Sequence, residues 1–93
     1  MATDPHLALT KIRINRRAGN LYVYDDRLVI ETLDGEREIP MGALERVATR
    51  RSMAGARLLL ALSSGEIVTV RRLSGSAARV AHRTIIEVAR RFH

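Results

Sequence analysis

Several residue types that build cross-links, metal sites and aromatic surfaces are missing or scarce in this chain of 93 residues. There is no cysteine, which excludes disulfide bonds, thiolate metal ligands and a thiol nucleophile. There is no tryptophan, and the aromatic residues are Tyr22, Tyr24 and Phe92 alone. The longest apolar run, residues 58–62, is far shorter than the roughly 20 residues of a membrane-spanning helix. The first residues lack the apolar stretch of a secretory signal, so we expect a cytoplasmic location.

Lysine is also scarce, since arginine supplies 15 of the 16 basic residues. The simplest interpretation of this ratio is a coding bias toward arginine, so the net charge of +6 says little about a partner. The distribution of charge is more informative, because the stretch 25–45 carries −5 whereas residues 46–93 carry +8. Regions of opposite sign favour self-association or the capture of an acidic partner.

What the chain does contain is a series of short β-forming segments from residue 8 to residue 71, separated by turn residues. Asp34-Gly35 predicts a type I′ hairpin turn, because both residues tolerate positive φ. On the first strand, alternation predicts that Ala8, Thr10, Ile12 and Ile14 share a face, opposite Leu7, Leu9, Lys11 and Arg13. The seven strands are expected at 7–14, 21–24, 27–32, 36–39, 44–51, 57–62 and 66–70, with a loop at 15–20 and a tight turn at 25–26.

The period changes after Gly75, which predicts an amphipathic helix of about four turns that starts near Ser76 as N-cap. Ile86 falls on its polar side, either as an isolated exposed residue or as a partner contact. Glu87 is expected to pair with Arg83 or Arg91, four residues away. The apolar arc consists of Ala77, Val80, Ala81, Ile85, Val88, Ala89 and Phe92, and the polar face includes Arg79, His82, Arg83, Arg90 and His93.

These elements predict a mainly β fold with one C-terminal α-helix: a seven-stranded bent sandwich or barrel capped by the amphipathic helix. In such a fold we expect Val80, Ile85, Val88 and Phe92 to point inward and fill the open end of the barrel. The length permits one domain, which we place at residues 8–93 after a short N-terminal tail at 1–7.

Three segments of the chain resemble the pleckstrin-homology-like (PH-like) superfold. Residues 21–30 look like its strand, tight acidic turn and strand, with the turn before Arg27-Leu28. Residues 39–47 are similar to the phrase I-P-L-x-x-I-x-x-V of pleckstrin-homology, GRAM and bacterial PH-like domains, and residues 58–70 resemble the hairpin before the closing helix. Many eukaryotic members carry a tryptophan in that helix, so its absence points to the bacterial PH-like branch. The resemblance implies a docking platform that uses a sheet edge or the groove beside the closing helix.

No arrangement of side chains suited to catalysis is evident, and we expect a protein that is not an enzyme and takes no cofactor or small-molecule substrate. His6, His82 and His93 have no companion ligands at metal-binding spacing. Asp25 and Asp26 are interpreted as turn formers rather than ligands of a cation.

Basic residues are therefore the candidate contacts for an anion or a partner. By position, Lys11, Arg13, Arg16 and Arg17 resemble the cluster that holds an inositol phosphate in lipid-binding pleckstrin-homology domains, although the facing hairpin is acidic. Arg50 and Arg51 near a strand end, and Arg83 and Arg90 on the helix, extend the set. We interpret the protein as an interaction module that docks a protein partner or self-associates. The alternative is a basic domain that binds an anionic surface, either nucleic acid or acidic membrane lipid.

Overall fold

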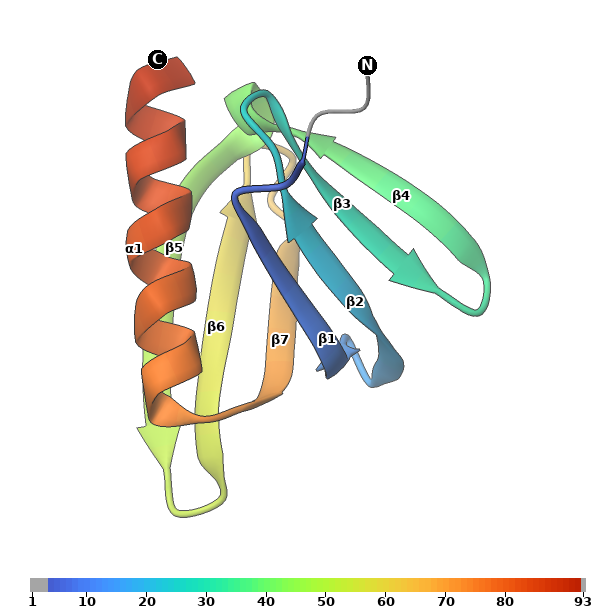
Figure 1. Ribbon diagram of the computed structural model, residues 1–93, viewed down its shortest axis with the longest axis vertical. Coiled ribbons are helices and arrows are strands. Elements are labelled where there is room, and N and C mark those ends of the chain that lie inside the picture. The colour runs from blue at the N-terminus through green and yellow to red at the C-terminus, as the bar shows by residue number, and fades with distance from the viewer. Residues whose placement is uncertain (1–3, 93) are drawn as a thin grey trace.

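A computed structural model describes residues 4–92 and contains one antiparallel sheet of seven strands followed by one helix (Figure 1). The fold class expected from the sequence, mainly β with a C-terminal helix, is confirmed, and it fits a bent sandwich or barrel. His93 and the first three residues of the expected tail lie outside the described residues. The elements are β1 (Leu7–Ile14), β2 (Arg17–Val23), β3 (Arg27–Thr32), β4 (Gly35–Pro40), the 3-10 helix η1 (Met41–Ala43), β5 (Leu44–Ser52), β6 (Gly55–Leu62), β7 (Ile67–Leu73) and α1 (Gly75–Phe92).

The strand order β4-β3-β2-β1-β7-β6-β5 makes β4 and β5 the two outer strands. The ladder between β1 and β7 is short, with Arg13 opposite Arg71 and Ile14 opposite Val70. Figure 1 shows β1–β4 inclined to β5–β7, with α1 beside β5 and β6. We call β1–β4 the first half of the molecule and β5–α1 the second half.

The core lies between the two inclined parts of the sheet and the helix. Side chains from every strand and from α1 contribute to it, and Met41 of η1 is fully buried. Among the described residues, no polar or charged residue is buried. The charges are therefore all available at the surface, either to one another or to a partner.

The predicted faces of β1 are wrong over its first part. Leu9, Ile12 and Ile14 are the buried residues, because the register shifts between Leu9 and Ile12 and Lys11 takes a positive φ of 54°. This bulge inserts one extra residue, so the side chains after it change face. Strand β1 begins at Leu7, the last residue assigned to the tail.

The predicted loop 15–20 is shorter in the structure, since β2 already begins at Arg17. Gly19 lies in this strand opposite Thr32, and a Cβ at Gly19 would collide with the carbonyl oxygen of Glu31. The glycine reflects a close approach of two strands, which composition alone does not distinguish from a turn.

The type I′ assignment is also wrong, although the hairpin itself is present. Thr32 pairs with Gly35, so Leu33 and Asp34 form the turn, and only Gly35 has positive φ, at 123°. A type I′ turn needs positive φ at both central residues.

The helix is capped two residues earlier than expected. The Ser74 hydroxyl oxygen accepts a hydrogen bond from the N–H of Ala77 (3.0 Å), so Ser74 rather than Ser76 is the N-cap. The buried stripe is Ala78, Ala81, Ile85 and Val88, narrower than the predicted arc.

Val80 and Phe92, expected to point inward, remain 52% and 48% exposed. The helix caps the bent sheet along β5, β6 and β7 as expected, but only a strip with spacings of three and four residues meets the core, and Val80 and Phe92 lie outside that strip. In the part of the chain that the structure covers, no helix has the length and apolar character needed to cross a membrane.

Candidate functional site

A cleft of about 420 Å³ lies between the outer strand β5 and the C-terminal part of α1. Its strand side is formed by the start of β5 and its helix side by the residues around Ile86. We call it the β5–α1 groove, and its lining residues are Leu44, Glu45, Arg46, Val47, Ile86, Ala89 and Arg90.

Local structure explains why the groove is there. Strand β5 pairs with β6 on one side and has no strand on the other, so one edge faces outward. The His82 ring nitrogen Nε2 lies 3.2 Å from the Val47 carbonyl oxygen and donates a hydrogen bond that ties the helix to this strand. Beyond this bond, toward the end of α1, helix and strand leave a space with Val47 and Ile86 on its walls.

Ile86 is the residue that sequence periodicity placed on the polar face of the helix. It is only half-buried, and with Ala89 it supplies the apolar helix side of the groove. Arg46 and Arg90 are exposed at the groove, from the strand and from the helix. The sequence signals that pointed here were therefore Ile86, the predicted contact Arg90 and the PH-like resemblance, which implies a groove beside the closing helix. The part played by β5 depends on strand order, which the sequence did not reveal.

Three arginines of the first half, Arg17, Arg27 and Arg37, are paired with carboxylates. Arg17 forms an ion pair with Asp34. Arg27 donates to Asp26 (2.8 Å), lies over the Tyr24 ring at 4.5 Å from its centre, and has its Nε 3.3 Å from Glu38. The hydrogen bond to Asp26 raises the pKa of the Arg27 guanidinium above its ordinary value.

Arg37 joins the two halves of the molecule. Its two terminal nitrogens donate to the two carboxylate oxygens of Glu66, at 2.7 and 2.5 Å, which is the bidentate geometry of a strong pair. This hydrogen bonding lowers the pKa of the Glu66 carboxyl and raises the pKa of the Arg37 guanidinium. The pair connects β4 to the residue that precedes β7, across the concave side of the bent sheet.

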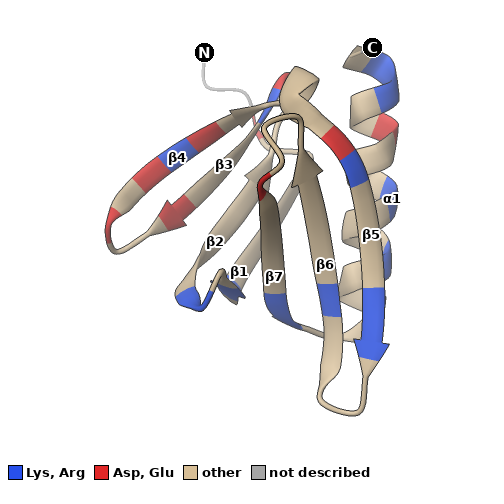
Figure 2. Ribbon diagram, turned by 180° about the vertical axis from the view of Figure 1, so that it is seen from behind, with Lys and Arg blue, Asp and Glu red and all other residues tan. Residues whose placement is uncertain are grey.

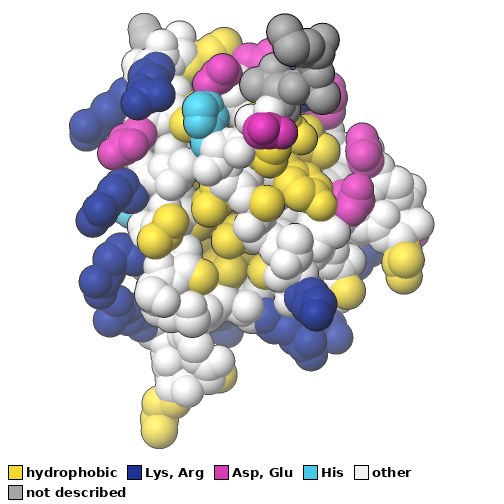
Figure 3. Space-filling view, viewed as in Figure 1, with side chains coloured by type: hydrophobic (Ala, Val, Ile, Leu, Met, Phe, Trp, Pro, Cys, Tyr) yellow, Lys and Arg dark blue, Asp and Glu magenta, His cyan; other side chains and the backbone are white. Residues whose placement is uncertain are grey.

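The arginines of the second half have no such partners. Among residues 4–92, none of the ten arginines from Arg46 onward lies within ion-pair distance of a carboxylate, so the pairing expected for Glu87 is not observed. Figure 2 shows blue along β5 and α1 and red on β3 and β4. Figure 3 shows the same separation on the molecular surface.

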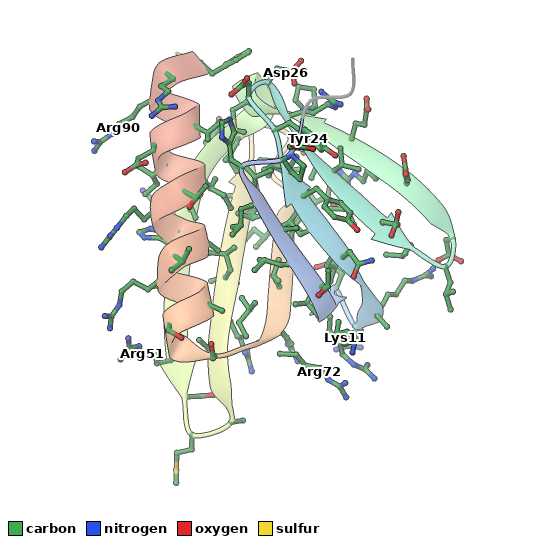
Figure 4. The ribbon with its side chains drawn as sticks, viewed as in Figure 1. Lys11, Tyr24, Asp26, Arg51, Arg72 and Arg90 are labelled. Atoms are coloured by element: carbon green, nitrogen blue, oxygen red, sulfur yellow. The ribbon has the colours of Figure 1, made fainter. Side chains whose placement is uncertain are left out.

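The predicted contact residues do not form one cluster. Arg17 is separated from the others by its pair with Asp34, and Arg83 and Arg90 lie on the exposed side of α1. The rest gather where the ends of β1, β5 and β7 meet the starts of β2 and β6, and Figure 4 shows Lys11, Arg51 and Arg72 at this end, with Arg90 at the other. We call this region the basic end, made of Lys11, Arg13, Arg16, Arg50, Arg51, Arg57, Arg71 and Arg72.

A second cleft, of about 350 Å³, opens between the β1–β2 turn and the β3–β4 hairpin. The cations that line it, Arg17 and Arg37, are already engaged by Asp34 and Glu66, and Glu36 adds a further carboxylate. This second cleft therefore offers a polyphosphate little positive charge that is not already compensated by a carboxylate.

The histidines and the acidic turn show no metal centre. Asp25 and Asp26 form the expected turn between β2 and β3, and the His6 ring contacts the Asp25 carboxylate, a contact that sequence reasoning missed. Within residues 4–92, no group of three or more histidine or carboxylate side chains is placed to hold a metal ion.

Among the described residues, the β5–α1 groove and the basic end thus hold seven of the ten arginines of the second half, all without carboxylate partners. The groove combines its cations with an apolar wall, and the basic end brings together cations from three separate segments of the chain. Comparison with known proteins adds no relative, since neither a protein-family model nor a curated protein matches this chain.

Proposed function

We propose that this protein is a non-catalytic docking domain of the PH-like type, which receives an extended acidic segment of a partner protein in the β5–α1 groove. The order of seven antiparallel strands and a closing helix supports the PH-like assignment. The proposal includes the cytoplasmic, bacterial setting that the sequence suggests.

The observation that carries the proposal is the combination of an outer strand, an apolar wall and unpaired cations in one cleft. The outward edge of β5 can take up an added strand through its main chain, and the space beside the helix can receive alternate side chains. Ile86 and Val47 provide apolar surface for one such side chain. The His82–Val47 hydrogen bond limits the groove at one end, so the occupant is a short segment.

The charges around the groove favour an acidic occupant. Arg46 and Arg90 line the groove, and Arg83 lies about two turns before Arg90 on the same helix. The lining contains a single carboxylate, that of Glu45. Because an exposed, uncompensated guanidinium attracts carboxylates, acidic residues flanking an apolar one complement this cleft. Burial of the apolar residue then supplies affinity, and the charges supply orientation and association rate.

The test is a selection of peptides from a random library on the wild-type domain. The peptides recovered are expected to carry aspartate or glutamate on both sides of an apolar residue. For such a peptide, fluorescence anisotropy should show about tenfold weaker binding to Ile86→Asp and to the double variant Arg46→Glu/Arg90→Glu. The double variant Arg57→Glu/Arg71→Glu makes the same charge change as Arg46→Glu/Arg90→Glu, at the basic end, and is the matched control, which should bind as the wild type does.

Two results would overturn this function. Peptides that bind the groove variants as tightly as the wild type would place recognition elsewhere. If light scattering shows concentration-dependent oligomers that Arg46→Glu/Arg90→Glu dissociates, the occupant is a second copy of this chain, whose acidic stretch 25–45 supplies the carboxylates.

A further inference from the structure

The β5–β6 hairpin ends in an apolar side chain that no described residue covers. Met53 is fully exposed, with a relative accessibility of 108%. The Ser52 hydroxyl oxygen accepts a hydrogen bond from the N–H of Ala54 (3.3 Å) and donates one to the carbonyl of Gly55 (3.3 Å). Figure 1 shows that this hairpin reaches beyond the other turns at its end of the molecule. The tip is therefore a hydrogen-bonded, protruding turn that presents methionine to its surroundings.

Positive charge surrounds this tip. Arg50, Arg51 and Arg57 belong to the hairpin itself, and each lies within four positions of Met53 in the sequence. The remaining cations of the basic end come from β1, the β1–β2 turn and the end of β7, and Figure 2 shows them farther from the tip than the arginines of the hairpin. Within the described chain, none of these cations has a carboxylate partner.

The pairing of strands at this end places like charges directly opposite one another. Arg50 is the cross-strand partner of Arg57, and Arg13 is the partner of Arg71. Like charges at directly opposed positions of an antiparallel pair destabilise the sheet. Folding therefore gains no ion pair from these four arginines, whereas contact with an anionic surface would remove their repulsion.

The backbone is also unusual at the same end. All non-glycine residues with positive φ in the described chain lie here: Lys11 (54°), Asn15 (49°), Arg16 (75°) and Arg72 (62°). Glycine or asparagine adopts such angles more easily than a long cationic side chain does. Three of these four positions nevertheless carry a cation, so local backbone preference does not account for the choice of residue.

We propose that the basic end docks on an anionic lipid bilayer, with Met53 inserted at the level of the headgroups and the surrounding arginines on lipid phosphates. An apolar side chain that reaches into the interface, with cations behind it, is the arrangement that holds peripheral proteins on acidic membranes. This surface is separate from the β5–α1 groove, and it contains neither Arg46 nor Arg90.

The methionine favours a bilayer over a nucleic acid as the anionic partner. Single-stranded nucleic acids are held by bases stacked on aromatic rings. The tyrosines of this chain, Tyr22 and Tyr24, belong to the other end of β2, and no aromatic residue lies in the β5–β6 turn. A fully exposed methionine gains free energy only where it leaves water, which the lipid interface provides.

The molecule contains a matched control for this tip. Leu33 at the β3–β4 turn is as exposed as Met53, at 100%, but is followed by Asp34 and Glu36. An equally exposed apolar residue in an acidic hairpin should be repelled by an anionic bilayer. A comparison of the two tips therefore distinguishes membrane insertion guided by charge from non-specific hydrophobic binding by any exposed apolar side chain.

The experiment measures binding to vesicles of phosphatidylcholine containing phosphatidylglycerol and to vesicles of phosphatidylcholine alone. Cosedimentation is expected only with the anionic vesicles and should weaken as salt rises. Met53→Ser should lower the partition coefficient about tenfold, whereas Leu33→Ser should leave it unchanged. Arg57→Glu should lower it at least tenfold while keeping the fold, because it replaces a like-charge pair with Arg50 by an opposite-charge pair.

The lack of tryptophan permits a direct observation of insertion. Met53→Trp introduces the only indole, whose emission should shift to shorter wavelength on anionic vesicles, and Leu33→Trp should show no shift. An unshifted emission at position 53, or a Met53→Ser variant that binds as the wild type does, would overturn the proposal. So would binding to duplex DNA without binding to vesicles, or binding that requires a phosphoinositide headgroup. None of these results bears on the groove, whose variants leave Met53 unchanged.

Discussion

Strands β2–β4 and the second half of the molecule use the same residue type, arginine, in opposite ways. In β2–β4, Arg17, Arg27 and Arg37 each face a carboxylate, and the resulting pairs cross between strands or between halves. In the second half, among the described residues, arginines face solvent or one another. Paired arginines contribute to the folded state, whereas unpaired ones leave their charge available to a partner.

The halves also differ in how they protect their hydrophobic side. The helix contacts β5, β6, β7 and η1, so the second half is covered by a layer of its own. The buried side chains of the first half instead pack into the core shared with the second half, and β2 and β3 approach each other closely at Gly19. The comparison indicates that each half has its own point of weakness, and three substitutions test this, from the largest expected effect to the smallest.

Removal of the helix contact should be the most damaging change. The side chain of Ile85, which belongs to α1, is fully buried in the core. Ile85→Ala leaves a cavity there and is expected to lower the free energy of unfolding by about 2–5 kcal/mol, measured by urea denaturation. Val80→Ala, on the same helix but half-exposed, is the control and should lower it by less than about 1 kcal/mol. Equal effects at both positions would show that the helix does not pack as described.

A single methyl group should disturb the first half. Gly19→Ala places a Cβ against the Glu31 carbonyl oxygen, which belongs to the backbone of β3 and cannot move alone. We expect a loss of about 1–3 kcal/mol in the free energy of unfolding, because two paired strands must separate locally. At Gly42 the added Cβ meets the half-exposed ring of Phe92, which can turn, so Gly42→Ala should cost less. A harmless Gly19→Ala would refute the close approach of the strands.

The smallest effect concerns the charge pair that joins the halves. Glu66→Gln should lower the free energy of unfolding at pH 7 by about 0.5–1 kcal/mol, because the pair is exposed and screened by solvent. Arg83→Ala removes an arginine that has no carboxylate partner among residues 4–92 and should change this free energy by less than about 0.5 kcal/mol.

The same pair predicts a dependence on pH. Because the hydrogen bond to Arg37 lowers the pKa of the Glu66 carboxyl in the folded state, its stabilisation is fully present above the ordinary pKa of glutamate. It is lost as the pH falls through the lowered, folded value. The difference in unfolding free energy between wild type and Glu66→Gln should therefore shrink on acidification, and a difference that stays constant would contradict the pairing.

Particular residues show why some features could be predicted and others could not. The turn at Asp25-Asp26 and the strand at Arg27–Thr32 follow from local preference, and the structure has both where they were expected. The faces of β1 were mispredicted because a bulge at Lys11 depends on pairing with β2, which is not a local property. The role of Ile86 was left open for a similar reason, since its surroundings come from β5, some forty residues earlier in the chain.

The sequence by itself determined the class of fold, the helix and the bipolar distribution of charge, because period and composition act over a few neighbouring residues. Only the tertiary structure decided which arginines are compensated, since Arg37 meets Glu66 and Arg17 meets Asp34 across strands. It also decided that the cations of the basic end, drawn from three parts of the chain, surround an exposed methionine. Sheet pairing sets these neighbours, and the absence of cysteine and tryptophan and the scarcity of lysine do not predict them.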